Sequence, residues 1–355
     1  MNHSHQPQHS FVENQLTEPT SLSQVINGAV AKTMNPAAHG WSARKLLTTE
    51  LHTGIGTWGR NKRWEYWGIM TPTHIIGVTI SSLEYAGVNQ LYVVDRATLR
   101  STSTEVIDPL ARNVSLPATY GEGIARFNSK TLNIRIEDTE TTGKRVTRIR
   151  ARTPDITLDV SMTRGSSDDA LHVVVPWSPT RFQYTIKEPA IPAQGKLTLG
   201  NETYSFGGEN DSRSFGVLDH GRGRWPYSMV WNWAAGSGYS QGARFALQIG
   251  DKWTNGTGST ENAVIIDGQL TKISEDLNWE YDRSDWMAPW RVSGSCLDAV
   301  FTPFYERVAT TKLLVLSGET HQCFGTWSGT YTHPNGTVYS LDGLEGWAEE
   351  AQNKW

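Results

Sequence analysis

The sequence predicts an all-β protein with two consecutive antiparallel β-barrels and a short C-terminal helix. Apolar residues alternate with polar ones over many short segments, which is typical of half-buried strands. Asp267-Gly268 and Asn335-Gly336 are residue pairs that favour tight hairpin turns. Segments with helical periodicity are scarce, so the chain has few helices that could connect parallel strands.

The alternation is clearest in residues 132–136, 156–162 and 245–249, where every second residue is a large apolar one. Such segments bury one face of a strand and leave the other polar. Many short strands joined by hairpins favour closed barrels, because closure removes exposed strand edges.

The chain divides into three predicted parts. Residues 1–35 are polar and should form a disordered or loosely ordered tail. Residues 36–190 should form the first barrel and residues 191–355 the second, because prolines and a glycine interrupt the strand pattern between residues 186 and 200. The helix is expected from Leu344 to Trp355, where acidic residues lie toward the first turns.

Composition excludes several classes of protein. The 355 residues are 37% apolar and 19% charged, with a net charge of -4, so sequence-independent nucleic-acid binding is not expected. No stretch approaches the about 18 apolar residues that span a bilayer. The chain starts without a secretory apolar region, and its two cysteines cannot build a disulfide framework. A reduced, cytoplasmic protein is expected, and its oligomeric state stays open.

Tryptophan is unusually frequent, with 15 in the chain beside 12 tyrosines and 9 phenylalanines. Indole rings are large and flat and carry one N–H donor, so a surplus favours a wide aromatic cavity that binds a small molecule. The alternative is that these rings simply fill the barrel interiors.

The segment Gly54-Ile55-Gly56-Thr57-Trp58-Gly59 matches the glycine pattern of dinucleotide-binding loops. That function needs a helix after the glycines, whose N-terminus receives the pyrophosphate. The residues that follow lack a helical apolar stripe and are expected to form a strand. No cofactor is therefore predicted.

The densest group of charged and aromatic residues runs from 219 to 233. Asp219, His220, Arg222 and Arg224 alternate in part with glycines, which let the backbone bend and bring side chains together. Such a cluster could transfer protons or bind an anionic group, or it could be a structural Asp–Arg pair. The aromatic and amide residues after it are candidate substrate contacts: Tyr227, Trp231, Asn232 and Trp233.

A second cluster follows at residues 279–291. Glu280 and Asp282 would share one face of a strand, and Tyr281 would lie on the other. If the acidic face points inward, the two carboxyls could couple and one could stay protonated as an acid. If it points outward, they are ordinary surface charges.

Glu261 and Asn262 lie at the end of a glycine-rich polar loop and could line the mouth of a pocket, although a plain hairpin turn is the default interpretation. The loop lacks the lysine of a phosphate-binding loop. His321 and Cys323 are two candidate ligands without a recognisable third, so no metal is predicted.

Several ordered motifs resemble a bacterial family of uncharacterised proteins that carries a domain-of-unknown-function label. The resemblance spans nearly everything after about residue 35. It rests on six segments, 64–67, 175–184, 219–227, 231–233, 257–262 and 346–350, which read WEYW, VPWS with RFQY, DHGRGRWPY, WNW, TG with EN, and GWAEE. That family is distantly similar to the lipocalin-like calycins, which include AttH-like proteins, carotenoid hydratases (hydroxyneurosporene synthases) and tocopherol cyclases. The resemblance implies two lipocalin-like barrels with a ligand space in or between them.

By that analogy, we expect an enzyme or binder for a small, largely apolar molecule. Hydratases and cyclases protonate an alkene, which suits a neutral carboxylic acid in a dry aromatic pocket. Asp219 and Asp282 are the expected proton donors, with Glu280 and His220 as further catalytic candidates. A carbohydrate-active enzyme with tryptophan platforms and paired carboxylates is one alternative. A carrier without catalysis is the other.

Overall fold

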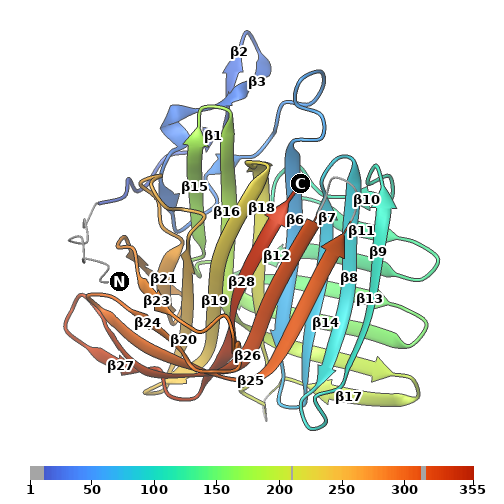
Figure 1. Cartoon of the computed structure of the whole chain (residues 1–355), viewed down its shortest axis with the longest axis vertical. Helices are drawn as coiled ribbons and strands as arrows, with labels where there is room; N and C mark the ends of the chain where they lie inside the picture. Colours follow the sequence, from blue (N-terminus) through green and yellow to red (C-terminus); the bar gives the residue numbers. More distant parts are fainter. Residues whose placement is uncertain (1–11, 209–210, 313–316) are drawn as a thin grey trace.

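The computed structural model describes residues 12–208, 211–312 and 317–355, and nearly all regular structure in these residues is β (Figure 1). The one helical turn among them is η1, Pro36–Ala38. Nearly all of the architecture consists of two large, strongly curved sheets, which confirms the predicted all-β class of two near-barrels.

Within the described residues, fourteen strands form the first sheet, along the path β10-β11-β12-β13-β14-β16-β18-β6-β7-β8-β9. Strands β4, β15 and β17 attach beside this path. The bounds are β4 Trp41–Ser42, β6 Asn61–Met70, β7 His74–Ser82, β8 Ala86–Asp95, β9 Ser101–Pro109, β10 Val114–Ser115, β11 Ile124–Asn128, β12 Asn133–Thr141, β13 Lys144–Arg152, β14 Ile156–Gly165, β15 Leu171–Ser178, β16 Arg181–Leu199, β17 Glu202–Phe206 and β18 Phe215–Arg224.

Ten strands of the described residues form the second sheet, along β22-β21-β20-β19-β28-β26-β25-β24-β23, with β27 beside β26. The bounds are β19 Ser228–Ser240, β20 Ala243–Asp251, β21 Asn262–Ile266, β22 Gln269–Ile273, β23 Asn278–Glu280, β24 Trp290–Ser293, β25 Leu297–Lys312, β26 Ser317–Thr332, β27 Val338–Ser340 and β28 Leu344–Lys354.

The predicted alternating segments are strands in the structure. Residues 156–162 lie in β14, whose buried and half-buried positions alternate, and residues 245–249 lie in β20. Asp267 and Gly268 take φ angles of 48° and 81° and join β21 to β22. Period-two patterning and the turn pair therefore predicted this hairpin correctly.

Part of the N-terminal region has regular structure. Residues 1–11 of the expected tail lie outside the described residues. The strands β1 Thr20–Ser21, β2 Ser23–Ile26 and β3 Ala29–Met34 lie within the rest of it. Strand β1 pairs with β5, Leu47–Thr48, and β2 and β3 form a hairpin.

The predicted C-terminal helix is wrong, because residues Leu344–Lys354 form the strand β28. This strand pairs with β19 on one side and with β26 on the other. Its central residues are buried on both faces, so backbone pairing from two neighbours outweighs the helix preference of its glutamates and alanines.

The predicted division between residues 190 and 191 lies inside β16. The register of β16 against β18 shifts between Glu188 and Ile191, which flank this point. Along the chain, the last strand of the first large sheet is β18 and the first strand of the second is β19. The residues that connect them are Trp225, Pro226 and Tyr227.

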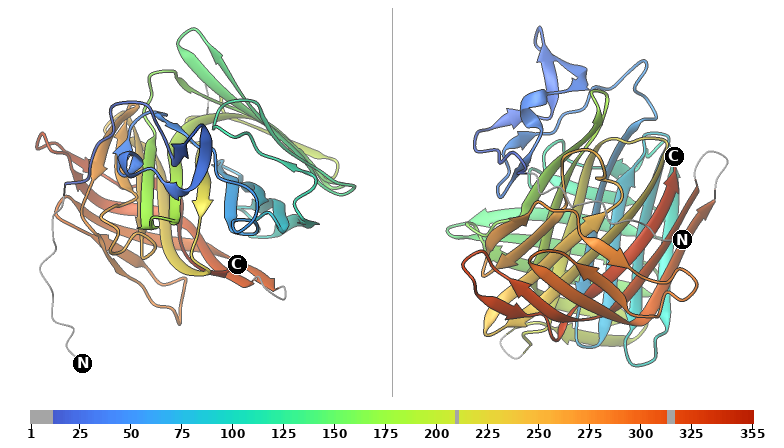
Figure 2. Two further views of the ribbon diagram at one scale, coloured as in Figure 1. Left: turned by 90° about the horizontal axis from the view of Figure 1, so that it is seen from above. Right: turned by 60° about the vertical axis from the view of Figure 1, so that its left-hand side comes forward.

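The two sheets face each other across a shared apolar contact (Figure 2). Val217 and Tyr92 of the first sheet pack in one cluster with Phe324 and Trp347 of the second. A Cβ on Gly68 would lie 2.5 Å from Cη2 of Trp347, so the glycine makes room for this ring. The space between the two sheets is where the candidate site lies.

Among the described residues, the structure contains no helix of the length and apolarity that crossing a membrane requires.

Candidate functional site

A cavity of about 280 Å³ lies between the two facing sheets. Strands β6, β16 and β18 supply one wall, and β19, β26 and β28 supply the opposite one. Seven aromatic side chains line it: Trp64, Tyr66, Trp225, Trp231, Trp233, Trp253 and Trp355. Two groups of tryptophans can therefore be distinguished. Those above line the cavity, whereas others are fully buried among side chains, namely Trp67, Trp290, Trp327 and Trp347.

Strand alternation decides which polar residues enter the cavity. Asp219 of β18 lies between Lys187 of β16 and Tyr66 of β6 in the sheet register, and paired residues share a face. All three line the cavity. His220, the next residue, must point to the opposite face, where its neighbours in register are Ile186 and Glu65.

An ionic cluster lies at the centre of the site. The Lys187 Nζ lies 3.1 Å from Asp219 Oδ1 and 3.3 Å from Glu261 Oε1. It also sits 3.9 Å from the centre of the Trp233 ring, a cation–π contact. The carboxylates raise the pKa of Lys187 against the opposing effect of burial, so its ammonium stays charged.

Glu261 enters the cavity because two neighbours hold its carboxyl group there. A Cβ on Gly250 would lie 2.6 Å from Glu261 Oε2, so only glycine leaves space for this group. Trp253 Nε1 donates a hydrogen bond to the same oxygen at 3.3 Å. Burial raises the pKa of Glu261 to about 7, against the opposing effect of Lys187.

Glu349 is a second buried acid in the cavity. It projects from the middle of β28, opposite Trp233 and Gln322 on the neighbouring strands. Its Oε1 accepts a hydrogen bond from Trp231 Nε1 at 3.2 Å. Burial raises the pKa of Glu349 to about 7, so a large fraction of it carries a proton at neutral pH.

The aromatic wall is a layer of contacting indoles. Trp225 and Trp253 stack with ring centres 5.4 Å apart, and Trp64 and Trp231 pack against Trp225 at 5.6 and 5.8 Å. Gly221 makes this possible, since a Cβ there would lie 2.2 Å from Trp64 Cζ2. In the DHGRGRW segment, Gly221 thus makes room for a ring and Gly223 for the backbone of Phe182, and both lie within strand β18.

A neutral polar group closes one end of the cavity. The hydroxyl groups of Tyr66 and Tyr92 lie 2.9 Å apart, and Gln322 hydrogen-bonds both of them. Arg307 lies over the Tyr92 ring at 4.1 Å and donates to Gln90 Oε1. These groups could orient a polar substituent of a ligand whose body lies against the tryptophans.

Four of the expected site residues line this cavity: Asp219, Trp231, Trp233 and Glu261. Asp219 and Glu261 share Lys187, and Trp231 bonds Glu349. Asp219 comes from β18 and Glu261 from the loop before β21, and no pattern in the sequence predicts that these two segments meet.

Five expected residues are buried away from the cavity. His220 and Arg222 face the interior of the first sheet, and Arg222 donates to the backbone oxygens of Trp64, Gly221 and Pro117. The others form structural hydrogen bonds: Arg224 with Asn61 and Lys32, Asn232 with Tyr281 and Glu349, and Asn262 with Gly250 and Glu275.

The remaining expected residues lie at or near the surface. Asp282 is exposed and accepts hydrogen bonds from the backbone and hydroxyl of Ser284, which lower its pKa. Glu280 and Tyr227 are also exposed. Tyr281 is half-buried; its ring stacks on Trp290, and its hydroxyl donates to Glu350. In the structure, Glu280 and Asp282 therefore do not face inward.

Lys187 and Glu349 were missed by the sequence analysis. Gln183, Thr185 and Lys187 occupy every second position of one strand. Such a row of polar residues is normally expected to face solvent. Glu349 lies in the segment whose composition predicts a helix. One signal could have identified Glu349. Trp231 and Trp233 alternate on one segment and Trp347 and Glu349 on another, which is the spacing of two strands that face one space.

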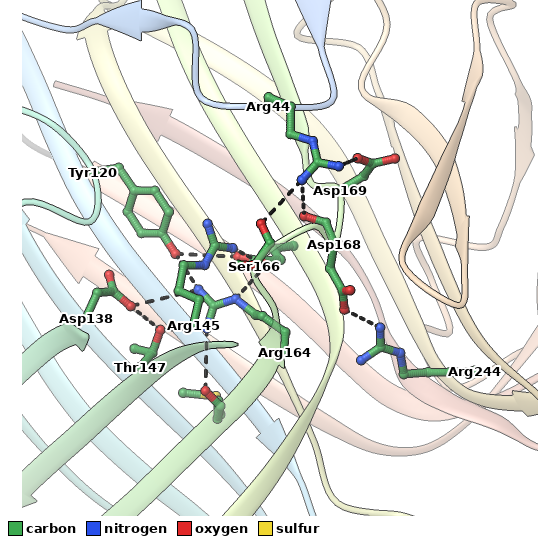
Figure 3. Close-up of polar contacts among 12 residues, drawn as sticks. Arg44, Tyr120, Asp138, Arg145, Thr147, Arg164, Ser166, Asp168, Asp169 and Arg244 are labelled. Atoms are coloured by element: carbon green, nitrogen blue, oxygen red, sulfur yellow. Dashed lines mark hydrogen bonds and ion pairs between the residues drawn. The ribbon is translucent and has the colours of Figure 1, made fainter. Parts of the chain in front are cut away.

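A second polar network occupies the interior of the first sheet (Figure 3). Arg164 pairs with Glu188 at 2.6 Å and donates to Tyr120 and Thr147. Arg145 pairs with the same glutamate. A cavity of about 270 Å³ lies next to this network, and each cation that lines it already pairs with a carboxylate. This region therefore reads as structural.

Within the described ranges, no group of three or more histidine, cysteine, aspartate or glutamate side chains is arranged to hold a metal ion.

Comparison with protein families gives one match, over residues 13–355, to the family described as Domain of unknown function (DUF2804). The chain belongs to this family. The family description assigns no activity. No curated protein sequence matches the chain.

Solved structures share the fold. Kievitone hydratase from Nectria haematococca matches with a TM-score of 0.52 and 9% identity, over 83% of this chain and 89% of that one. CghA with Sch210972 matches with a TM-score of 0.52 and 10% identity, over 98% of this chain and 97% of that one. The two-sheet architecture is therefore one on which a hydratase is built.

Proposed function

We propose that this protein is an enzyme that acts on a small, largely apolar molecule by acid catalysis of the hydratase or cyclase type. One observation carries the proposal. Two buried carboxyl groups, those of Glu261 and Glu349, have pKa values near 7 inside a cavity lined by tryptophan. A carboxylic acid of this pKa can donate a proton at neutral pH.

Glu349 is the proposed proton donor. Glu261 pairs with Lys187 at 3.3 Å, which favours its carboxylate. Glu349 forms no ion pair among the described residues: Trp231 and Gln322 lie beside it, and the charges of Lys187, Asp219 and Arg307 act on it from farther away. This replaces Asp219 and Asp282 in the donor role, since Asp219 is paired with Lys187 and Asp282 is exposed.

The reaction begins when Glu349 transfers its proton to a carbon of an alkene. The positive charge that forms on the neighbouring carbon faces the indole rings of Trp231, Trp233 and Trp225, whose π electrons stabilise it. In a hydration, water adds to this carbon and Asp219 accepts the proton that water loses. In a cyclisation, a second alkene attacks instead, and Asp219 accepts a proton from a carbon next to the new cationic centre, which leaves an alkene in the product. A proton passing from Asp219 back to Glu349 restores the starting state.

The fold likeness to kievitone hydratase is compatible with this chemistry, although at 9% identity it supports the architecture alone. A carbohydrate-active enzyme is the alternative, because tryptophan can stack on sugar faces. A carrier that binds the molecule without converting it is the other alternative. The predicted cytoplasmic location is part of the proposal and is tested by cell fractionation.

Native mass spectrometry of the protein purified from its own host identifies any retained small molecule. Incubation of that molecule with the enzyme in deuterium oxide should then give a product with deuterium on carbon. Glu349→Gln should lower turnover by about 10²–10⁴-fold while ligand binding persists. Glu345→Gln is the matched control, because Glu345 lies on the same strand and pairs with Arg96 outside the cavity.

A retained molecule that is never converted would favour the carrier. A retained or converted sugar would favour the carbohydrate enzyme. Full activity of Glu349→Gln, or a product without deuterium, would overturn the proposed mechanism.

A further inference from the structure

The glycine segment 54–59 is an ordered, projecting loop. Gly54, Gly56 and Gly59 have φ angles of 122°, 85° and 76°, conformations that favour glycine, and backbone hydrogen bonds to Gly54 close the turn. Between them, Ile55 is 96% exposed and Trp58 is 61% exposed. The motif that resembles a nucleotide loop therefore presents two large apolar side chains to solvent.

A second apolar tip lies at the same end of the molecule. Val25 and Ile26, at the tip of the β2–β3 hairpin, are 57% and 56% exposed. Figures 1 and 2 show this hairpin and the loop that leads into β6 projecting from one end. The two segments also touch, because a Cβ on Gly56 would lie 3.1 Å from Lys32 Nζ of β3.

Positive charge gathers between these tips, in a chain whose net charge is -4. Arg224 donates to the backbone oxygen of Lys32. Burial and the charge of Arg60 lower the pKa of Arg181, and burial with the charges of Arg181 and Arg60 lowers that of Arg224. In the described part of the chain, Lys32, Arg60 and Arg181 form no ion pair with a carboxylate.

Two acids, Glu50 and Glu84, line a pocket at this end of the molecule. Glu84 accepts hydrogen bonds from the backbone of Arg60 and Asn61 and from the Asn61 side chain, so its carboxylate is tied to the base of the loop. The local balance around the tips is therefore positive.

This end adjoins the aromatic cavity. Lys62 Nζ donates to the backbone oxygen of Gly59 at 3.2 Å and lies 5.9 Å from the Trp355 ring centre. Trp355 lines the cavity. The base of the loop therefore lies next to a residue of the cavity wall.

We propose that this end of the molecule docks onto an anionic lipid bilayer. Ile55, Trp58, Val25 and Ile26 insert at the level of the headgroups, and the cations between them lie against lipid phosphates and carboxylates. The docking would bring an apolar substrate to the cavity from the membrane. It does not rest on the proposed function, because binding is measured without substrate.

The geometry favours a bilayer over a protein partner. The four apolar residues lie on two separate convex tips, whereas a protein interface is a contiguous packed patch. Tryptophan and aliphatic side chains flanked by lysine and arginine are the combination that suits a membrane interface. Cations without carboxylate partners suit a surface of lipid phosphates, because that surface carries negative charge over its whole area.

The test is co-sedimentation of the full chain with vesicles. Vesicles of phosphatidylcholine with phosphatidylserine should bind the protein, and binding should weaken as salt screens the charges. Ile55→Ser with Trp58→Ser should abolish most of it. Arg60→Ser with Arg181→Ser should weaken it by about fivefold for each cation removed. Ile55, Trp58 and Arg60 are exposed and Arg181 is half-buried, and circular dichroism checks that both variants fold.

Val308→Ser is the matched control, since Val308 is 53% exposed on β25, where its neighbours Arg307 and Ala309 face the cavity and it faces away. It should bind as the wild type does. Absence of wild-type binding at low salt, equal binding by the loop variants, or equal binding to pure phosphatidylcholine would each overturn the proposal. So would a dimer that forms through these tips in the absence of vesicle binding.

Discussion

Lys187 and Asp219 are direct partners on the adjacent strands β16 and β18, and their side chains meet at 3.1 Å on the cavity face of the first sheet. Glu261, from a loop of the second sheet, completes the contact at 3.3 Å. One ammonium group therefore joins the two halves of the molecule at the point where the proposed chemistry takes place. Its loss would leave two carboxyl groups without a counter-charge.

Lys187→Met should lower the free energy of unfolding by about 3–5 kcal/mol, because it leaves buried carboxylates unpaired. Urea unfolding at neutral pH measures the loss. Lys187→Met combined with Asp219→Asn should recover part of it. Lys45→Met is the control, since its pair with Glu122 is exposed and should contribute less than about 1 kcal/mol. Equal effects of the two lysine variants would contradict the buried pair.

Glu349→Gln should change how stability depends on pH. The pKa of Glu349 is about 7 in the folded state and 4.5 in the reference state, so the folded protein holds this proton more tightly. Its contribution to stability is complete below about pH 4.5 and is lost as pH rises to about 7. The loss is about 3 kcal/mol. The difference between wild type and Glu349→Gln, from urea unfolding at about pH 5 and about pH 8, isolates it; a difference that does not vary with pH would contradict the raised pKa.

Trp231→Phe should move the pH profile of turnover to higher pH. The Trp231 N–H donates to the Glu349 carboxyl and lowers its pKa, against the larger effect of burial. Phenylalanine keeps a ring but removes this donor, so the proton should stay on Glu349 to a higher pH. Turnover of the substrate, measured across pH, checks the direction. A shift to lower pH would contradict the proposed donor.

Gly221→Ala should destabilise the protein by about 1–3 kcal/mol, because the new methyl group overlaps the Trp64 ring in a packed wall. Thermal unfolding measures this effect. Trp64→Phe in the same chain should restore part of the stability by giving the methyl group room. If the double variant is less stable than the sum of the two single changes, the overlap is not the cause.

His172→Gln should make the protein more resistant to acid. Burial, with the positive charge of Arg145 nearby, lowers the pKa of His172 to about 3, and Tyr184 hydrogen-bonds its Nδ1. Between about pH 6.5 and pH 3 the unfolded chain binds a proton that the folded protein does not, so stability falls as pH falls. The midpoint of acid unfolding should move to lower pH in the variant. An unchanged midpoint would contradict the buried neutral imidazole.

The pair Asp219 and His220 illustrates the limit of reading a cluster from the sequence. Adjacent residues on a strand point to opposite faces, so the DHGRGRW segment divides between the cavity and the interior of the first sheet. The expectation of one compact cluster assumed that its glycines bend the chain. They instead lie flat in β18, and Gly221 accommodates Trp64.

The β class, the hairpins and the aromatic cavity could be predicted because they depend on local signals: side-chain period, turn residues and the number of indoles. The participation of Lys187 could not be predicted, and that of Glu349 only if residues 344–354 are taken as a strand. Both belong to polar or helix-favouring patterns in the sequence, and each becomes a cavity residue only because a neighbouring strand from elsewhere in the chain fixes its face and removes it from water. Burial, which raises the pKa of Glu349, is a property of the two facing sheets together and not of any one segment.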